Sequence, residues 1–527
     1  MKRIAVVLLA FALSLGGAGA ALADGIDMKV RGQWDFAFGW AHNAGFKDSI
    51  HNNSKTRDDD NFLARQRIRT QINFITSEYL QAVLMFEIGD LDWGRANGNT
   101  GPGSGGALDA DGVNVETKRA YLDWVIPNTE VSVRMGIQGI TLPSTPMGSP
   151  LFDADVAGIV ISAPVTDWLA ASLVWLRPFD AYQNDSGAFG FTDNDNFSDE
   201  VDAFALLLPM QFDGLNITPY GIYSLVGANS GLYDYVFAAR EGGLRHDNSV
   251  TRENGRTQAF WLGTHMEMTL LDPLVLNLEA IYGHLKPVDL TGFAHPETQA
   301  NAMPGLNKGW SLNRSLGTSG WFLAATLDYK LDWMTPGIFG WWSSGDGENA
   351  DHDGKYGRLP VLGNDGGSFG PTTFGSAGTY GIGTEGAIMG SGAGTWGIGL
   401  QFADVTFIED LSHTLRFAYY RGTNDPELIR KGYVTNESGD VMVGVANDSR
   451  YATDAMYLTR KDSVFEINFD HSYKIYDNLT AVLELGYLHL KADRDVWKHQ
   501  STKAGISGQR DESDNAWKAE LNFRYEF

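Results

Sequence analysis

The sequence predicts an all-β protein, a transmembrane antiparallel β-barrel, and three observations lead to this prediction. Apolar and polar residues alternate over many segments of about ten residues, as lipid-facing and lumen-facing side chains do in a barrel strand. Short and long connections follow one another in turn between these segments. After residue 15 no apolar run reaches the ~20 residues that a membrane-spanning helix needs.

The final segment, 516–527, shows this alternation most clearly. Its apolar members, separated by charged or amide residues, are Trp517, Ala519, Leu521, Phe523, Tyr525 and Phe527. Because successive side chains of a strand point to opposite faces, one face is apolar and the other charged. A soluble sandwich would bury the apolar face in a protein core, whereas a barrel would expose it to lipid. The aromatic residues at both ends favour the barrel, since such rings collect at the two membrane interfaces.

The N-terminus predicts a signal peptide over residues 1–23. Lys2 and Arg3 precede a short apolar run, and small residues ending in Ala-x-Ala at Ala23 provide a cleavage site. We expect residues 24–527 to form a single transmembrane domain. That mature chain would carry 38 basic and 65 acidic residues, which argues against a nucleic-acid partner. The chain has no Cys, which suits a barrel whose hydrogen-bond ladder closes on itself.

The segments predict about 18 strands, an even number that places both termini on the periplasmic side. The alternative is 16, because the segments 156–163, 218–224 and 338–343 alternate least clearly. Either number leaves a lumen that the strand side chains do not fill, so function would lie in the lumen-facing row.

The densest inward charge is the row Arg65, Arg67 and Arg69. Cations of four neighbouring strands are assigned to the same wall, so the candidate pore constriction contains Lys29, Arg31, Arg65, Arg67, Arg69, Arg119 and Arg134. Arg119 is the least certain of these in register, since it lies between Lys118 and Ala120. Crowded cations repel, so we expect acidic groups to oppose them across the channel.

The connection 141–155, the third long loop, is unusual for a solvent-exposed loop. It contains three prolines and few charges, which suits a loop that folds back into the barrel and packs there. Two carboxylates, Asp153 and Asp155, come at its end, and they could instead simply begin the sixth strand.

The chain resembles bacterial trimeric outer-membrane porins in its signal peptide, its alternation of strands with short and long connections, its third loop and its terminal Phe527. Among these porins it is most similar in pattern to those of sulfate-reducing and related bacteria. The resemblance implies an outer-membrane homotrimer of a Gram-negative bacterium, exported through the periplasm. It implies that Phe527 is the residue read by the assembly machinery. It also implies an inward third loop with Asp153 and Asp155 opposite the basic row.

The expected function is passive diffusion of ions and small hydrophilic solutes through a water-filled channel, without catalysis. A channel specific for sugars or organic anions is the alternative, and an adhesin or structural barrel is a third reading. An outer-membrane phospholipase or protease would need an inward Ser/His/Asp set, and the sequence offers none at a suitable register.

No cofactor is expected. Asp193, Asp195 and Asp199 form a weak calcium candidate in an external loop, where an ion would bridge to anionic lipopolysaccharide. The pairs Trp341–Trp342 and Tyr419–Tyr420 are expected in the interfacial aromatic girdles.

Overall fold

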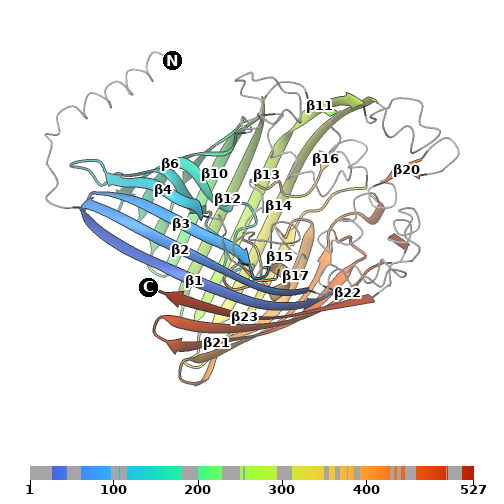
Figure 1. Ribbon diagram of the computed structural model, residues 1–527. Coiled ribbons are helices and arrows are strands. Elements are labelled where there is room, and N and C mark those ends of the chain that lie inside the picture. The colour runs from blue at the N-terminus through green and yellow to red at the C-terminus, as the bar shows by residue number, and fades with distance from the viewer. Residues whose placement is uncertain are drawn as a thin grey trace, which may run out of the picture.

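The protein, seen in a computed structural model, is a single closed ring of strands (Figure 1). The structure describes residues 26–43, 61–95, 106, 115–180, 200–227, 250–252, 256–293, 311–348, 355–362, 368–376, 378–384, 392–427, 433–435, 441–444, 458–493, 495–496 and 513–527. The signal-peptide prediction and the calcium candidates lie outside these ranges. Among the described residues, no helix has the length and apolarity that crossing a membrane as a helix requires.

The strands of the ring follow the chain in order. They are β1 (Asp27–His42), β2 (Asn61–Ser77), β3 (Leu80–Asp92), β4 (Val115–Val125), β5 (Ser132–Thr141), β6 (Asp153–Thr166), β7 (Leu169–Asp180), β8 (Glu200–Leu207), β9 (Met210–Phe212), β10 (Leu215–Gly227), β12 (Arg256–Leu271), β13 (Leu274–Phe293), β14 (Ser311–Tyr329), β15 (Thr335–Ser343), β17 (Thr395–Ile408), β18 (Leu411–Gly422), β21 (Ser463–Tyr476), β22 (Leu479–Lys491) and β23 (Ser513–Glu526). Short additions are β11 (Val250–Arg252) on β13, β16 (Lys355–Tyr356) on β14, a separate hairpin of β19 (Tyr433–Thr435) with β20 (Val441–Gly444), and the 3-10 turn η3 (Thr373–Gly375).

Counting β8 and β9 as one interrupted strand, the described ring has eighteen antiparallel strands. The predicted fold class and strand number are therefore confirmed, and the alternative of sixteen is wrong. The three weakly alternating segments are the strands β6, β10 and β15.

The alternation of side chains along β1 distinguishes the outer face of the ring from its inner face. Trp34 and Trp40 are 39% and 43% exposed on the outer face, whereas Asp35 and Ala37 between them are fully buried. The same pattern recurs in the outward Leu, Ile and aromatic residues of the other strands. The ring thus has an apolar exterior and a polar interior, which is the arrangement of a barrel that crosses a lipid bilayer.

The two ends of the barrel differ in their connections. Turns such as those from β2 to β3 and from β6 to β7 are two residues long, whereas the other end carries the long connections. The strands themselves continue far toward this end in one hairpin, where β13 ends only at Phe293 and β14 already begins at Ser311. The sorting by length identifies the long-loop end as the extracellular one.

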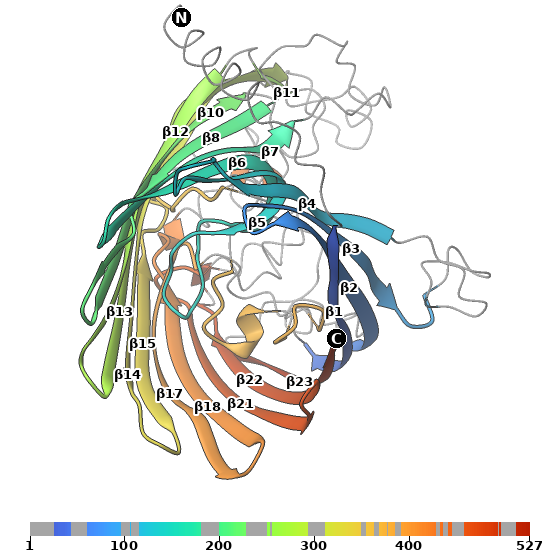
Figure 2. The same cartoon turned by 90° about the vertical axis from the view of Figure 1, so that its left-hand side faces the viewer.

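The closing seam joins the first strand to the last, where the ends meet in Figure 2. Phe527 lies beside Gly32, and their main chains exchange hydrogen bonds of 2.8 and 3.0 Å. A β-carbon placed on Gly32 would lie 2.5 Å from both the Phe527 ring and the carbonyl oxygen of Arg69. Only glycine permits this approach of three strands.

We therefore expect Gly32→Val to prevent closure and to abolish most of the folded protein. Gly221→Val is the matched control, because the nearest atom to an added β-carbon there is 3.4 Å away. The measurement is the fraction of protein that migrates as the compact, heat-modifiable form on electrophoresis. Equal folded fractions for the two variants would contradict this role of the seam.

The aromatic-girdle prediction is half wrong. Trp342 and Tyr419 are exposed on the outer face, but Trp341 and Tyr420 are buried on the inner one, where Tyr420 donates a hydrogen bond to Glu466. The reason is the period of a strand: adjacent residues cannot share a face.

Candidate functional site: the charged lumen

The row predicted on β2 faces the lumen. Arg65, Arg67 and Arg69 follow one another on the inner face, and all three are engaged in ion pairs. Arg65 Nε lies 2.6 Å from Asp92, and Arg69 Nε lies 2.6 Å from Glu87.

The acids that neutralise this row come from the neighbouring strand, not from across the channel. β3 continues to Asp92, so Asp90 and Asp92 belong to the inner face of this strand. The register sets Arg69 opposite Glu87 and Arg65 opposite Asp92, with an irregularity between them that brings Asp90 within 3.6 Å of Arg67. The expectation of acidic groups opposing the arginines across the lumen is thus replaced by pairing within one wall.

Arg67 is held at the centre of a larger network. Its guanidinium lies 3.5 Å from Asp35, which also accepts hydrogen bonds of 2.7 and 3.1 Å from Arg524 on β23. It also donates to the main-chain oxygens of Tyr380 and Gly381, at 2.5 and 3.4 Å. Asp35 is fully buried, so two arginines from different strands depend on one carboxylate.

Asp35→Asn should destabilise the barrel by about 3 kcal/mol, since it removes the buried carboxylate shared by the guanidiniums of Arg67 and Arg524. Asp27→Asn, on the same strand but exposed at its end, should change stability by less than about 0.5 kcal/mol. Urea unfolding followed by tryptophan fluorescence in detergent measures both. A similar small change in the two variants would refute the assignment of Asp35 as the central counter-charge.

β4 contains a β-bulge beside Arg119, whose partner Asp155 lies, by register, on the same face of β6 as the outward Ile161. Met85 pairs with Arg119 and Phe86 with Thr117, so Lys118 is an extra residue in β4. A bulge turns two successive side chains toward the same side. Asp155 accordingly contacts both Lys118, at 2.8 Å, and Arg119, at 2.7 Å.

The two candidate acids both lie in β6, the alternative that the sequence left open. Asp155 pairs with β4 and not with the arginine row of β2. Asp153 accepts a hydrogen bond of 2.7 Å from Thr141 and is exposed. Neither is brought to the row Arg65, Arg67 and Arg69 by any described contact.

The remaining predicted cations are spread along the wall. Arg134 lies 2.7 Å from Asp123, with its guanidinium 4.8 Å from the centre of the Tyr121 ring. Lys29 and Arg31 have the same inward register, but both are exposed at the short-turn end of β1. The inner faces of β23 and β1–β5, which we call the ion-pair strip, therefore carry a belt of paired charges rather than an unpaired positive surface.

A Gly-rich part of the connection between β15 and β17 contacts this strip. Residues 368–376 and 378–384 lie inside the ring of strands, as Figure 2 shows for the 3-10 turn η3. We call this stretch the inner segment. Its main-chain N–H groups are bound by lumen-facing carboxylates: Phe374 by Glu466 at 3.1 Å, Thr379 by Glu484 at 2.9 Å, and Thr384 by Glu520 at 2.9 Å.

Charge and aromatic packing complete the anchoring of the inner segment. Lys518 is buried and donates to the main-chain oxygens of Ser376 and Thr384, both at 2.9 Å. The ring of Tyr380 lies 4.0 Å from the guanidinium of Arg524. The inner segment is thus bound to the consecutive strands β21–β23 and to Arg67 of β2, so it lies against this part of the inner wall.

A cluster of buried apolar side chains packs against β8–β15. The β5–β6 connection contributes Leu151 and Phe152, and the β15–β17 connection contributes Leu362 and Phe369. Hydrogen bonds join the two connections, with Leu362 N donating to Leu151 O at 3.1 Å and Gly370 N donating to Met147 O at 2.9 Å. On the inner face of β5, outside this cluster, the side chain of Arg134 is 41% exposed.

Two signals in the sequence could have revealed the missed residues. The stretch 355–395 is long but nearly uncharged, which is the same feature that suggested an inward third loop. Glu466, Glu484 and Glu520 stand at inward positions of otherwise regular strands, where buried carboxylates need donors.

A closed ring with an apolar exterior, a charged interior and long loops at one end defines an outer-membrane β-barrel of the porin type. No family model and no curated protein sequence matches the chain. Among solved structures, it is similar to OccAB1 of Acinetobacter baumannii at 13% identity, with a TM-score of 0.46, over 97% of this chain and 99% of that one. It is also similar to OccK11 (OpdR) of Pseudomonas aeruginosa at 11% identity, with a TM-score of 0.44, over 94% of this chain and 96% of that one.

OpdQ of Pseudomonas aeruginosa is a further similar structure, at 10% identity and a TM-score of 0.46, over 95% of this chain and 99% of that one. These likenesses are distant, and the architecture is established by the register and burial of this chain itself. They give no support to the particular resemblance to porins of sulfate-reducing bacteria.

Proposed function

We propose that the protein is a passive channel for ions and small hydrophilic solutes, whose passage runs between the ion-pair strip and the inner segment. One observation carries this proposal: charged side chains of β2–β5 keep contact with solvent inside a ring whose exterior is apolar. Water-filled lumens with charged walls conduct ions and polar solutes. No catalytic step is part of the proposal.

We propose that the third loop narrows this passage together with the inner segment. Its main chain at Thr145 donates a 3.1 Å hydrogen bond to Glu279, a buried residue of β13 on the far side of the ring. Its apolar residues pack on the connection that carries the inner segment. The constriction would thus be formed by two connections, with Arg134 on its open side. The acids Asp153 and Asp155 would act at the base of this loop rather than opposite the row of β2.

A channel specific for organic anions or sugars is the second candidate. It is favoured by one feature, the exposed guanidinium of Arg134 beside the Tyr121 ring, because a planar fork can bind a carboxylate through two hydrogen bonds.

Swelling of proteoliposomes in iso-osmotic solutes tests both functions. Passive diffusion predicts rates that fall with solute size and rise linearly with concentration. A specific channel predicts a rate that saturates for one class of solute. Liposomes that do not swell in any small solute would contradict both and favour an adhesin or structural barrel.

The remaining features of the resemblance also stay proposals. We propose a homotrimer, contact with lipopolysaccharide, cleavage after Ala23, and recognition of Phe527 during assembly. We propose no obligatory cofactor, with calcium at Asp193, Asp195 and Asp199 as an optional external site. Native mass spectrometry of the mature protein, with and without a calcium chelator, would measure the mass of the chain, the number of copies and bound calcium.

A further inference from the structure

Three buried polar side chains lie together where the third loop contacts the barrel wall. They are Thr145 of the loop, Tyr220 of β10 and Glu279 of β13, which are 2%, 4% and 3% exposed. Among the residues that the structure describes, the two hydroxyl groups and Oε1 of Glu279 have no hydrogen-bond partner. Buried polar atoms without a partner are rare in native folds, and each one requires an explanation such as a bound water or ion.

The register of β10, β12 and β13 brings the phenol and the carboxylate together. Tyr220 stands opposite Gly263 of β12, and its ring lies across that glycine, because a β-carbon added to Gly263 would overlap the ring and the hydroxyl oxygen. Gly263 in turn pairs with Ile281 of β13, two residues from Glu279 on the same face. Diagonal neighbours of this kind are within reach of aromatic and long side chains. The phenol therefore reaches over β12 toward the Glu279 carboxylate, with which it interacts electrostatically.

The third loop approaches the same carboxylate from the lumen. The main-chain N–H of Thr145 donates to Oε2 of Glu279 at 3.1 Å, and the Thr145 hydroxyl lies beside the carboxylate without the geometry of a hydrogen bond. An ionised carboxylate can accept about four hydrogen bonds, so its capacity is largely unused here. Oxygens of β10, β13 and the third loop consequently face one another in a place that bulk water does not reach.

The negative charge of Glu279 is not balanced by any described side chain. No lysine, arginine or histidine of the described residues forms an ion pair with it, and His265, directly opposite on β12, hydrogen-bonds to Asn277 instead, at 3.3 Å. Two neighbours in sequence, Ile281 on the strand and Met147 on the loop, belong to the buried apolar cluster. A buried carboxylate in apolar surroundings without a counter-charge takes up either a proton or a cation.

We propose that a monovalent cation, sodium in ordinary salt solutions, binds between Glu279, Tyr220 and Thr145. Carboxylate and hydroxyl oxygens are hard ligands, which suit hard cations. A proton on Glu279 donates one hydrogen bond and leaves another of the three oxygens without a partner, whereas a cation binds all three. One carboxylate balances one positive charge, which favours a monovalent ion over calcium. The bound ion links the third loop to two strands of the wall.

The test measures the stability of the full mature protein in detergent while sodium chloride replaces N-methyl-D-glucamine chloride at constant ionic strength, with EDTA present. Urea unfolding followed by tryptophan fluorescence is the readout. A cation that binds only the folded state raises the ratio of folded to unfolded protein in proportion to its concentration above Kd, so each tenfold rise in sodium should raise this ratio about tenfold. Equal stability in the two salts, which a protonated Glu279 would give, overturns the proposal.

Two variants assign the effect to these residues. Glu279→Gln keeps an acceptor for the Thr145 N–H but removes the charge, so its stability should not depend on sodium. Tyr220→Phe removes one ligand oxygen and should shift the sodium dependence to about tenfold higher concentration.

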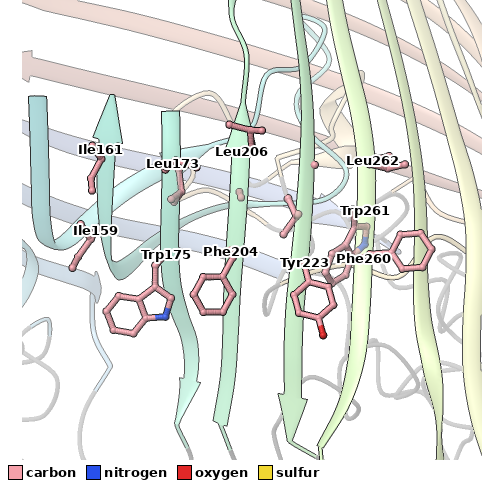
Figure 3. A pocket seen from close by; sticks show the side chains of 14 residues that line it. Ile159, Ile161, Leu173, Trp175, Phe204, Leu206, Tyr223, Phe260, Trp261 and Leu262 are labelled. Carbon is pink, nitrogen blue, oxygen red and sulfur yellow. The ribbon is translucent and has the colours of Figure 1, made fainter. Parts of the chain in front are cut away.

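The matched control is Tyr223→Phe. Tyr223 belongs to the same strand but lies on the outer wall, at a shallow apolar groove (Figure 3), so this variant should respond to sodium as wild type does. The proposal is also overturned if Glu279→Gln still responds to sodium, or if Tyr220→Phe has the sodium dependence of wild type. It does not depend on conduction, so a barrel that fails to conduct could still bind the ion.

Discussion

Replacing Arg65, Arg67 and Arg69 together by Gln is expected to make the channel strongly cation-selective. The three guanidiniums neutralise Asp35, Glu87, Asp90 and Asp92, and their removal leaves these four carboxylates in the lumen with far fewer counter-charges. Unpaired carboxylates in a confined lumen raise the local concentration of cations by about tenfold or more. The cation-to-anion permeability ratio should rise by about that factor.

The measurement is the reversal potential of the purified protein in a planar bilayer under a salt gradient. The control removes three cations at the short-turn end, Lys29, Lys330 and Lys474, and should shift the potential much less. Their side chains stand in open solvent at the rim, where salt screens them. If the reversal potential of the triple Arg variant equals that of wild type, the ion-pair strip does not determine the ion selectivity.

Freeing the inner segment is expected to have the largest effect on conductance. Glu484→Ala with Glu520→Ala removes the acceptors of the Thr379 and Thr384 main-chain N–H groups and the charges nearest Lys518. The segment then loses its main-chain hydrogen bonds to Glu484 and Glu520, while the barrel wall keeps its hydrogen-bond ladder. We expect a several-fold larger single-channel conductance with more open-channel noise.

Glu267→Ala is the matched control for this variant. Glu267 is a carboxylate of β12 near the short-turn end, and its hydrogen bond is to Asn216 of the next strand, not to the inner segment. Its removal should leave the conductance within the range of wild type. If the double variant also conducts as wild type does, the inner segment is not what limits the passage.

The fold could be predicted because the alternation that decides it is local. Each strand carries its own apolar row, so the eighteen strands and the order of short and long connections can be derived segment by segment. The position of Phe527 at the seam follows from closure of the barrel, since the last strand must pair with the first.

The site could be predicted only in part, because its pairing depends on register between strands. The period of two places Arg65, Arg67 and Arg69 inside, but only the register reveals that Asp90 and Asp92 are their partners. The bulge at Lys118 adds a residue that no alternation predicts. The alternation of apolar and polar residues could not place the inner segment. A loop without such alternation can fold into the barrel or extend away from it.

Single-channel recording of the purified protein in a planar bilayer tests the central claim most directly. The claim is that the apolar rows face lipid and enclose a passage bounded by charged groups. It predicts stepwise insertion events, each adding a fixed, ohmic conductance that grows with salt concentration. A correctly folded barrel that inserts into the bilayer but adds no conductance at any salt concentration would contradict it.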